Sequence, residues 1–227
     1  MLQLLKSAVV ATALVAGAAQ AVVSVTIEAP TIESTTSTGV LGVESFNGAT
    51  AGLQSLVTTF GGSTVTGSFS GINILTADQF GGAGGTGNYA AVLSGNSSTL
   101  TFTGAPVSFV GFFASSIDSG SSIQVFSGSS LVYSKAMPLV PVTAGHFGNP
   151  DAPFAGQNAT QAYAFFTLTS STPITSIIFT QAAGGGNFEF DNLTVGNVPE
   201  PASWALMMAG FAMVGFSMRR RVRAVAA

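Results

Sequence analysis

Short segments in which apolar and polar residues alternate run through the chain from residue 22 to residue 198. Val23, Val25 and Ile27 alternate with polar residues near the start of this region, and Leu100 and Phe102 alternate with threonines in its middle. A period of two is typical of a β-strand with one buried face, and nothing in the region has the pattern of a long helix. The region is therefore predicted to be all-β.

The alternation predicts nine or ten short strands with glycine-rich turns between them. Residues 107–113 are apolar on both faces, as expected of a central strand. Residues 123–126 and 131–133 flank a Ser/Gly turn and are predicted to form a hairpin. Further strands are expected at 65–74, 89–93, 162–169, 174–181 and 188–195. Short strands in this number are typical of a β-sandwich or jelly roll.

The apolar pattern of the last predicted strand changes face in mid-strand. Phe188 and Phe190 share one parity, whereas Leu193 and Val195 have the other. A β-bulge, which inserts one extra residue, would return all four side chains to the same face. The sequence therefore predicts a bulge near Asp191, whose carboxylate would be placed to cap a turn or bind a cation.

The region 22–198 carries almost no positive charge. Lys135 is its only basic residue and stands against eight acidic residues, which gives a net charge of −7. The acidic residues are Glu28, Glu33, Glu44, Asp78, Asp118, Asp151, Glu189 and Asp191. A domain without arginine cannot neutralise a row of phosphates, so nucleic acid is excluded as a partner. The chain has no cysteine, which excludes disulfides, thiolate nucleophiles and cysteine-bound zinc.

The first 21 residues have the features of a cleavable signal peptide. Lys6 precedes an apolar run from residue 8 to residue 19, which is too short to span a bilayer. Ala19 and Ala21 are the small residues that signal peptidase recognises at positions −3 and −1. Cleavage is predicted after Ala21, which leaves 22–198 as the β-domain.

Residues 199–227, here called the tail, differ in composition from the β-domain. The tail contains the only tryptophan, Trp204, and four of the six basic residues of the chain. Residues 202–218 carry no charge and would span roughly 25 Å as a helix, slightly less than a comfortable bilayer crossing. Trp204 at one end and the basic segment 219–223 at the other predict a single transmembrane helix with the arginines on the cytoplasmic side. An ordinary tail anchor or a buried helix of the domain remains an alternative.

Two prolines open the tail. Pro199 and Pro201 cannot lie inside a helix without losing donors, so they mark its boundary and hold Glu200 in an extended segment that a processing enzyme can reach. Together with the residues that follow, this segment resembles the PEP-CTERM sorting signal, in its Pro-Glu-Pro-x-x-Trp-Ala variant. The resemblance rests on Pro199, Glu200, Pro201, Trp204, Ala205, Met207, Met208, Gly210, Phe211, Gly215, Arg219, Arg220 and Arg221.

The resemblance implies a substrate of an exosortase in a Gram-negative bacterium that makes extracellular polysaccharide. Such a chain is exported, held transiently in the inner membrane and processed near its Pro-Glu-Pro, and it ends at the cell surface or outside the cell. The β-domain also resembles a group of exosortase-dependent surface proteins, which implies a secreted β-sandwich and supplies no catalytic residues. That second resemblance rests on Asn88, Tyr89, Phe112, Phe113, Ser116, Ile117, Asp118 and the segments 123–126 and 187–196.

Residues with catalytic or ligand-binding potential are few. His146 is the only histidine and no Gly-x-Ser-x-Gly elbow is present, so a solvated loop histidine is the simpler interpretation and no catalytic residue is predicted. Residues 82–87 match Gly-x-Gly-x-x-Gly but precede a predicted strand, which indicates a flexible loop and no nucleotide cofactor. Glu44 and Asp191 are candidate ligands of a structural calcium ion, although calcium prefers six to eight oxygens.

These features predict a non-enzymatic protein of the cell surface or the extracellular matrix, associated with extracellular polysaccharide. A carbohydrate-binding module for neutral glycans is the alternative, since the domain is acidic and lacks arginine. It would need aromatic platforms, and Tyr89, Tyr133 and Tyr163 are the only tyrosines, while Trp204 belongs to the tail. An ice-binding protein and a hydrolase are further alternatives. Ice binding would use rows of outward-facing threonines such as 99, 101 and 103, and hydrolysis would use a pair of carboxylates.

Overall fold

The computed structural model describes residues 21–197 and 208–213. Within residues 21–197 the fold is all-β, which confirms the prediction, with two single-turn 3₁₀ helices, η1 (Ala83–Gly85) and η2 (Ala144–His146), and residues 208–213 are helical. The strands are β1 (Val23–Ile27), β2 (Val40–Glu44), β3 (Gly52–Thr58), β4 (Val65–Thr76), β5 (Asn88–Val92), β6 (Ser97–Gly104), β7 (Phe109–Ile117), β8 (Ser121–Ser127), β9 (Ser130–Ala136), β10 (Ala162–Ser170), β11 (Ser176–Gln181) and β12 (Phe188–Gly196).

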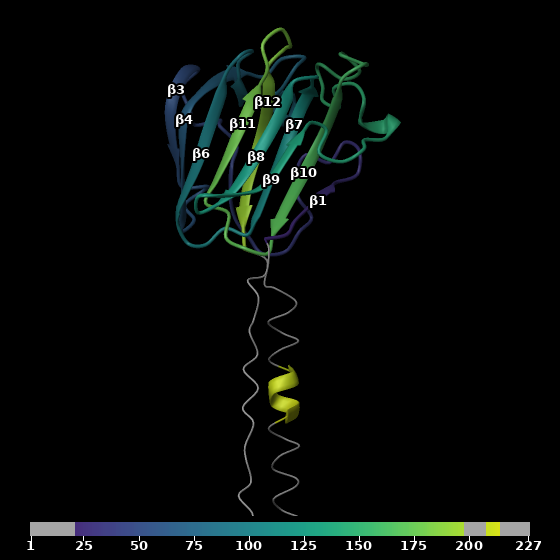
Figure 1. Ribbon diagram of the computed structural model, residues 1–227. Helices are drawn as coiled ribbons and strands as arrows, with labels where there is room; N and C mark the ends of the chain where they lie inside the picture. Colours follow the sequence, from purple (N-terminus) through teal and green to yellow (C-terminus); the bar gives the residue numbers. More distant parts are fainter. Residues whose placement is uncertain (1–20, 198–207, 214–227) are drawn as a thin grey trace, which may run out of the picture.

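The strands form one continuous antiparallel sheet that folds over on itself (Figure 1). Along the sheet the order is β1-β10-β7-β12-β5-β4-β6-β11-β8-β9, with β2 added to β12 and β3 added to β4. The fold occurs at β4, which pairs with β6 through residues 65–69 and with β5 through residues 73–76. The finer expectation of a sandwich of separate sheets therefore differs from the structure, because β4 joins the two layers.

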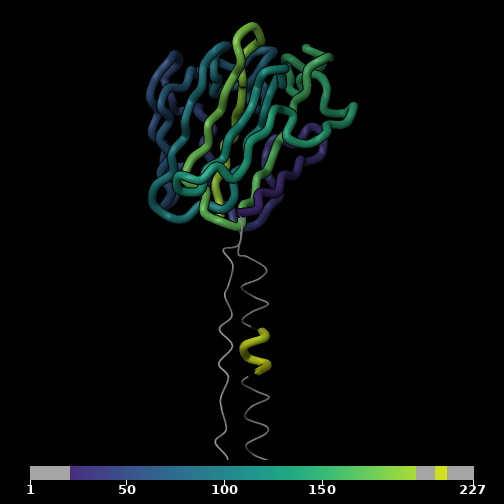
Figure 2. The backbone as a smooth tube through the Cα atoms, viewed as in Figure 1, coloured from purple at the N-terminus to yellow at the C-terminus, as the bar shows by residue number. Residues whose placement is uncertain are grey.

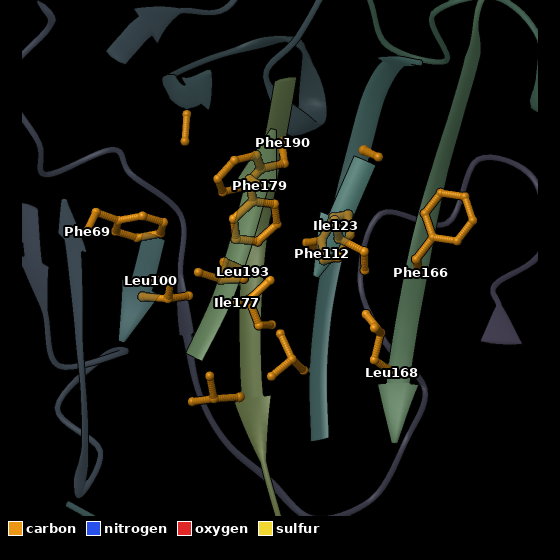
Figure 3. Close-up of a cluster of buried hydrophobic side chains, with 14 of the residues drawn as sticks. Phe69, Leu100, Phe112, Ile123, Phe166, Leu168, Ile177, Phe179, Phe190 and Leu193 are labelled. Carbon is orange, nitrogen blue, oxygen red and sulfur yellow. The ribbon is translucent and has the colours of Figure 1, made fainter. Parts of the chain in front are cut away.

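The two layers face each other across a core rich in phenylalanine (Figure 3). Phe179 of β11 stacks on Phe190 of β12 with ring centroids 4.5 Å apart, although the two strands are not paired. Phe112 of β7 makes an edge contact with Phe179 at 5.6 Å. The described buried members of this core cluster lie between residues 46 and 195, within the β-domain.

The predicted bulge is present in β12. The pairing of β12 with β7 shifts register between Asp191 and Thr194, and Asn192 has a positive φ of 47°. As a result Phe188, Phe190, Leu193 and Val195 all belong to the core cluster, as the change of parity predicts.

The predicted strands are present, and the hairpin is formed by β8 and β9. Two strands, β2 and β3, were not predicted. Each pairs with a single neighbour, and each exposes apolar side chains, with Leu53 73% exposed and Val43 41% exposed. A half-exposed edge strand has no clean alternation, which explains why the period of two does not reveal it.

The long connection from residue 137 to residue 161 packs against the side of the sheet (teal to green in Figure 2). With the glycine-rich segment 82–87 it covers the outer face of β7 and β10. Phe113, Tyr163 and Phe165 form a second buried cluster there, with Ala83 packed against it. The face of β7 and β10 that points away from the main core is therefore also buried, beneath these loops.

Candidate functional site

The two ends of the β-domain lie together. Three antiparallel steps connect β1 to β12 through β10 and β7, so the start of β1 and the end of β12 are at the same end of the sheet (Figure 1). The turn between β11 and β12 lies at the opposite end (Figure 2). Val22 and Asn197, the first residue after the predicted signal-peptide cleavage and the last described residue before the tail, therefore lie at the same end of the domain.

Hydrogen bonds fix both ends to the sheet. The Val22 N–H donates to Ser171 Oγ at 2.9 Å, and the Ser171 N–H donates back to the Val22 carbonyl at 3.0 Å. The Asn197 N–H donates to the Gly39 carbonyl at 3.0 Å, and Ser108 Oγ donates to Asn197 Oδ1 at 2.8 Å. The described part of the folded domain therefore extends to Asn197, two positions before the tail begins at Pro199.

The predicted processing residues lie outside the described residues. This applies to Ala19 and to the sorting-signal residues Pro199, Glu200, Pro201, Trp204, Arg219, Arg220 and Arg221. Ala21 is described and immediately precedes the ordered start of the domain. Of the predicted transmembrane segment 202–218, residues 208–213 are described and are helical. The described part of the chain contains no helix with the length and hydrophobicity that a bilayer crossing needs.

Three carboxylates hold the glycine-rich segment 82–87. Asp191 Oδ2 accepts a hydrogen bond from the Ala83 N–H at 2.9 Å. The Gly84 N–H donates to Glu33 Oε2 at 2.7 Å and to Asp151 Oδ2 at 3.1 Å. These acids come from three distant segments, so we call the arrangement the carboxylate clamp. The segment is thus a loop between β4 and β5, as predicted, with a short 3₁₀ turn that these hydrogen bonds hold at its start.

The carboxylate clamp contains acids that are hard to ionise. Burial, followed by the hydrogen bond and the charge of Asp151, raises the pKa of Glu33 to about 8. Burial raises the pKa of Asp191 to about 7, although the N–H groups of Ala83 and Asn192 favour its charged form. No basic side chain takes part in either set of interactions. Glu33 and Asp191 therefore stay protonated at pH values at which a solvated carboxyl group would be ionised.

Glu189 is a second buried acid of β12 on the outer face, beside Asp191. It is 5% exposed and lies opposite Ser115 of β7, and its Oε2 and the Ser115 Oγ have no hydrogen-bond partner among the described residues. Burial raises the pKa of Glu189 to about 9, with smaller contributions from the charges of Asp118 and Asp78. A carboxyl group in this environment is neutral at pH 7.

The two calcium candidates already bind donors of the protein. Glu44 Oε1 accepts from the Phe46 N–H at 2.6 Å, and its other oxygen accepts from the Thr58 hydroxyl. Asp191 Oδ1 accepts from the Asn192 N–H at 2.6 Å, in addition to its bond to Ala83. Among the described residues no group of three or more acidic or histidine side chains is arranged to hold a metal ion. Asp191 instead caps the turn at η1, the other role that the sequence allows.

His146 is a buried structural residue. It is 4% exposed, so the interpretation as a solvated histidine is wrong. Its Nδ1 accepts from the Thr143 N–H at 3.2 Å, which places the proton on Nε2, and Nε2 donates to the Glu28 carbonyl at 3.2 Å. Both ring nitrogens are used to attach the long connection to the segment that follows β1. This arrangement leaves no nitrogen free to act as a general base.

Tyrosine platforms for sugar stacking are scarce. Tyr89 is 1% exposed and its hydroxyl donates to Asp78 Oδ1 at 3.2 Å. Tyr163 is 3% exposed and its hydroxyl donates to the Gln79 carbonyl at 2.7 Å. Only Tyr133 of β9 is partly exposed. Among the described phenylalanines, Phe80 and Phe147 are exposed, at 39% and 46%.

An open depression of about 240 Å³ lies where β4 leaves β6 and joins β5. Its lining is uncharged and includes Leu53, Ser70, Asn73, Asn96 and Ser97. The predicted threonine row 99, 101 and 103 begins near the depression, where the Thr99 N–H donates to Ser70 Oγ at 3.0 Å, and Thr101 and Thr103 are exposed further along β6.

Comparison with known proteins identifies the tail. The model of the PEP-CTERM protein-sorting motif matches residues 197–221, which include every sorting-signal residue predicted from the sequence. No curated protein and no solved structure matches the chain significantly. The match begins at Asn197, the residue at which the folded domain ends. The chain therefore carries a PEP-CTERM protein-sorting motif, which implies export to the cell envelope or surface with an exosortase as the processing partner.

Proposed function

We propose that the β-domain is a non-enzymatic component of the cell surface or extracellular matrix, released to its site after removal of both ends of the chain. The observation that carries this proposal is that the domain's two ends adjoin at one end of the sheet. Signal peptidase and the exosortase would then act on the same side of the folded domain, while the inner membrane transiently holds the tail. The rest of the domain would face away from the membrane.

The use of the carboxylates supports a non-enzymatic role. Glu33, Asp151 and Asp191 accept hydrogen bonds from the backbone of one loop, and Glu44 accepts from the ends of two others. A glycosidase needs two carboxyl groups that flank an open sugar site, roughly 5 to 10 Å apart. The depression has no acidic residue in its lining. The acids of the carboxylate clamp therefore serve the fold.

Cell fractionation tests the proposal. An epitope tag placed at Gly128, in the turn between β8 and β9 where the added residues meet open space, leaves both ends of the chain unchanged. We expect the tagged protein at the surface or in the medium when the exosortase is present. Without the exosortase, or with Glu200→Ala, we expect it in the inner membrane. Inner-membrane protein in all these backgrounds would contradict the proposal.

Enzymatic activity of the purified domain would overturn the non-enzymatic part. Hydrolysis of a polysaccharide or ester that is lost in Asp151→Asn, with the fold intact by circular dichroism, would identify Asp151 as catalytic. The matched control is Glu28→Gln, which removes a carboxylate that accepts from Thr36 at the surface. We expect no turnover from the wild-type domain.

A further inference from the structure

The outer face of the layer formed by β4, β6, β11 and β8 is an uncharged surface rich in hydroxyl groups. None of these four strands contains Asp, Glu, Lys, Arg or His. The register aligns their outward residues in rows, since Thr101 lies opposite both Ser68 and Ser176. Ser97 and Thr180 lie opposite each other further along the same pair, β6 and β11, with their hydroxyls 2.8 Å apart. We call this surface the hydroxyl face.

The hydroxyl face differs sharply from the other layer. The carboxylate clamp and Glu189 lie on the outer side of β12 and β7, under the loops. The strands that border the depression, β3 to β6, contain no ionisable side chain other than Tyr89, and Tyr89 is buried. The carboxylate clamp and Glu189 therefore lie on the other layer, whereas the strands of the hydroxyl face and those that border the depression are uncharged. Lys135 is exposed on β9, which pairs with β8 at the edge of the hydroxyl face away from the depression.

The depression provides amide groups at the border of the hydroxyl face. Asn73 is half-buried, and its side-chain amide has no hydrogen-bond partner among the described residues. Asn96 donates through Nδ2 to the Ser94 carbonyl at 3.0 Å, which leaves its Oδ1 available. Leu53, 73% exposed, provides an apolar wall. A free amide pairs with two neighbouring hydroxyls, because it both donates and accepts.

The backbone of β4 opens this space. Its pairing with β6 ends at Phe69 and its pairing with β5 begins at Asn73. Gly71, between them, has a φ of +140°, which is strained for any residue with a Cβ, and it has nothing within 4 Å of the position of a side chain. The depression is therefore a consequence of the folding of the sheet at β4.

We propose that the depression binds one residue of a neutral polysaccharide, whose chain continues across the hydroxyl face. The volume is below the roughly 300–1,000 Å³ of pockets for drug-sized ligands, which suits a single sugar residue. The absence of charge in the lining of the depression and in the strands β4, β6, β11 and β8 favours hydroxyl-rich polymers over anionic or cationic ones. The proposal rests on the proposed function, because the domain meets such polymers only after export.

Affinity electrophoresis in native gels tests the proposal. The domain 22–197, which contains its own core, is run through gels with dextran, mannan or hydroxyethylcellulose, and through a gel with anionic alginate. We expect retardation by at least one neutral polymer and none by alginate. Absence of retardation by all neutral polymers, or equal retardation by alginate, would overturn the proposal. Because localisation is not involved, failure here leaves the sorting proposal standing.

Two substitutions locate the binding surface. Asn73→Asp places a charge in the depression with almost no change of shape, and Leu53→Ala removes its apolar wall. Each should weaken retardation about 2- to 10-fold, the effect of losing one or two net hydrogen bonds or a small apolar contact. Ser24→Asp adds the same charge on exposed β1, and Val57→Ala truncates another exposed side chain of β3. Equal losses in these controls would refute the depression as the site.

A flat surface of hydroxyl groups could bind ice instead of a polysaccharide. An assay of ice recrystallisation inhibition distinguishes these two ligands. The proposal expects none at concentrations that give retardation by the polymer. Inhibition without retardation would overturn the polysaccharide proposal in favour of ice.

Discussion

The buried carboxyl group of Glu189 predicts that the domain loses stability as the pH rises. Its pKa is raised from 4.5 to about 9, so the unfolded chain releases this proton above pH 4.5 while the folded domain retains it up to about pH 9. Between these values the unfolded state binds fewer protons, and the free energy of unfolding falls with increasing pH. The stabilisation from Glu189 is fully present below pH 4.5 and is lost as the pH rises to the folded-state pKa of about 9.

The size of the effect follows from the pKa difference. Each pH unit inside the window is worth 1.36 kcal/mol, so Glu189 alone should cost about 4 kcal/mol of stability between pH 5 and pH 8. Glu33 and Asp191 contribute in the same direction up to about pH 8 and about pH 7. Glu189→Gln has a neutral side chain of the same shape at every pH. The variant should therefore resemble the wild type at pH 5 and be markedly more stable at pH 8.

Urea denaturation of residues 22–197 at pH 5, 6.5 and 8 measures this difference. Far-UV circular dichroism is the suitable signal, because the only tryptophan lies in the tail. Glu28→Gln is the control, since Glu28 accepts hydrogen bonds from Thr36 at the surface and should keep the wild-type profile. Parallel pH profiles for the wild type and Glu189→Gln would refute the assignment of Glu189 as a buried neutral acid.

Two further predictions concern the packing around Gly42 of β2 and the calcium candidates Glu44 and Asp191. Gly42→Ala should lower the free energy of unfolding by about 1–3 kcal/mol, because the added Cβ would overlap the carbonyl oxygen of Phe60. Gly48→Ala is the control and should unfold like the wild type, because its Cβ would lie in open space. Calcium and a chelator should give the same melting temperature, because Glu44 and Asp191 are hydrogen-bonded to the protein; a clear increase with calcium would instead support the calcium hypothesis.

The strands with clear alternation were predictable from the sequence because burial alone decides their pattern. In β12 even the bulge was predictable, since Phe190 and Leu193 cannot share a face without an extra residue. The edge strands β2 and β3 were not predictable, because their apolar residues are partly exposed and have no strict period. The closure of the layers at β4 depends on where one long strand changes partners, which the local sequence of β4 does not encode.

The carboxylate clamp could not be predicted because its acids are far apart in the sequence. Glu33 and Asp151 are separated by more than a hundred residues and meet only where two loops converge on Gly84. Similarly, His146 is buried because its nitrogens bind Thr143 and the Glu28 carbonyl, and only the first of these is a local contact. The tail is the opposite case, since its motif is contained in one continuous segment.

Intact mass measurement of the exported protein tests the account most directly. The account predicts a chain that begins at Val22 and ends near Pro199–Pro201 in cells with the exosortase, and a chain that retains the tail in cells without it. The same mature mass in both backgrounds would contradict the claim that an exosortase processes this protein through its PEP-CTERM motif.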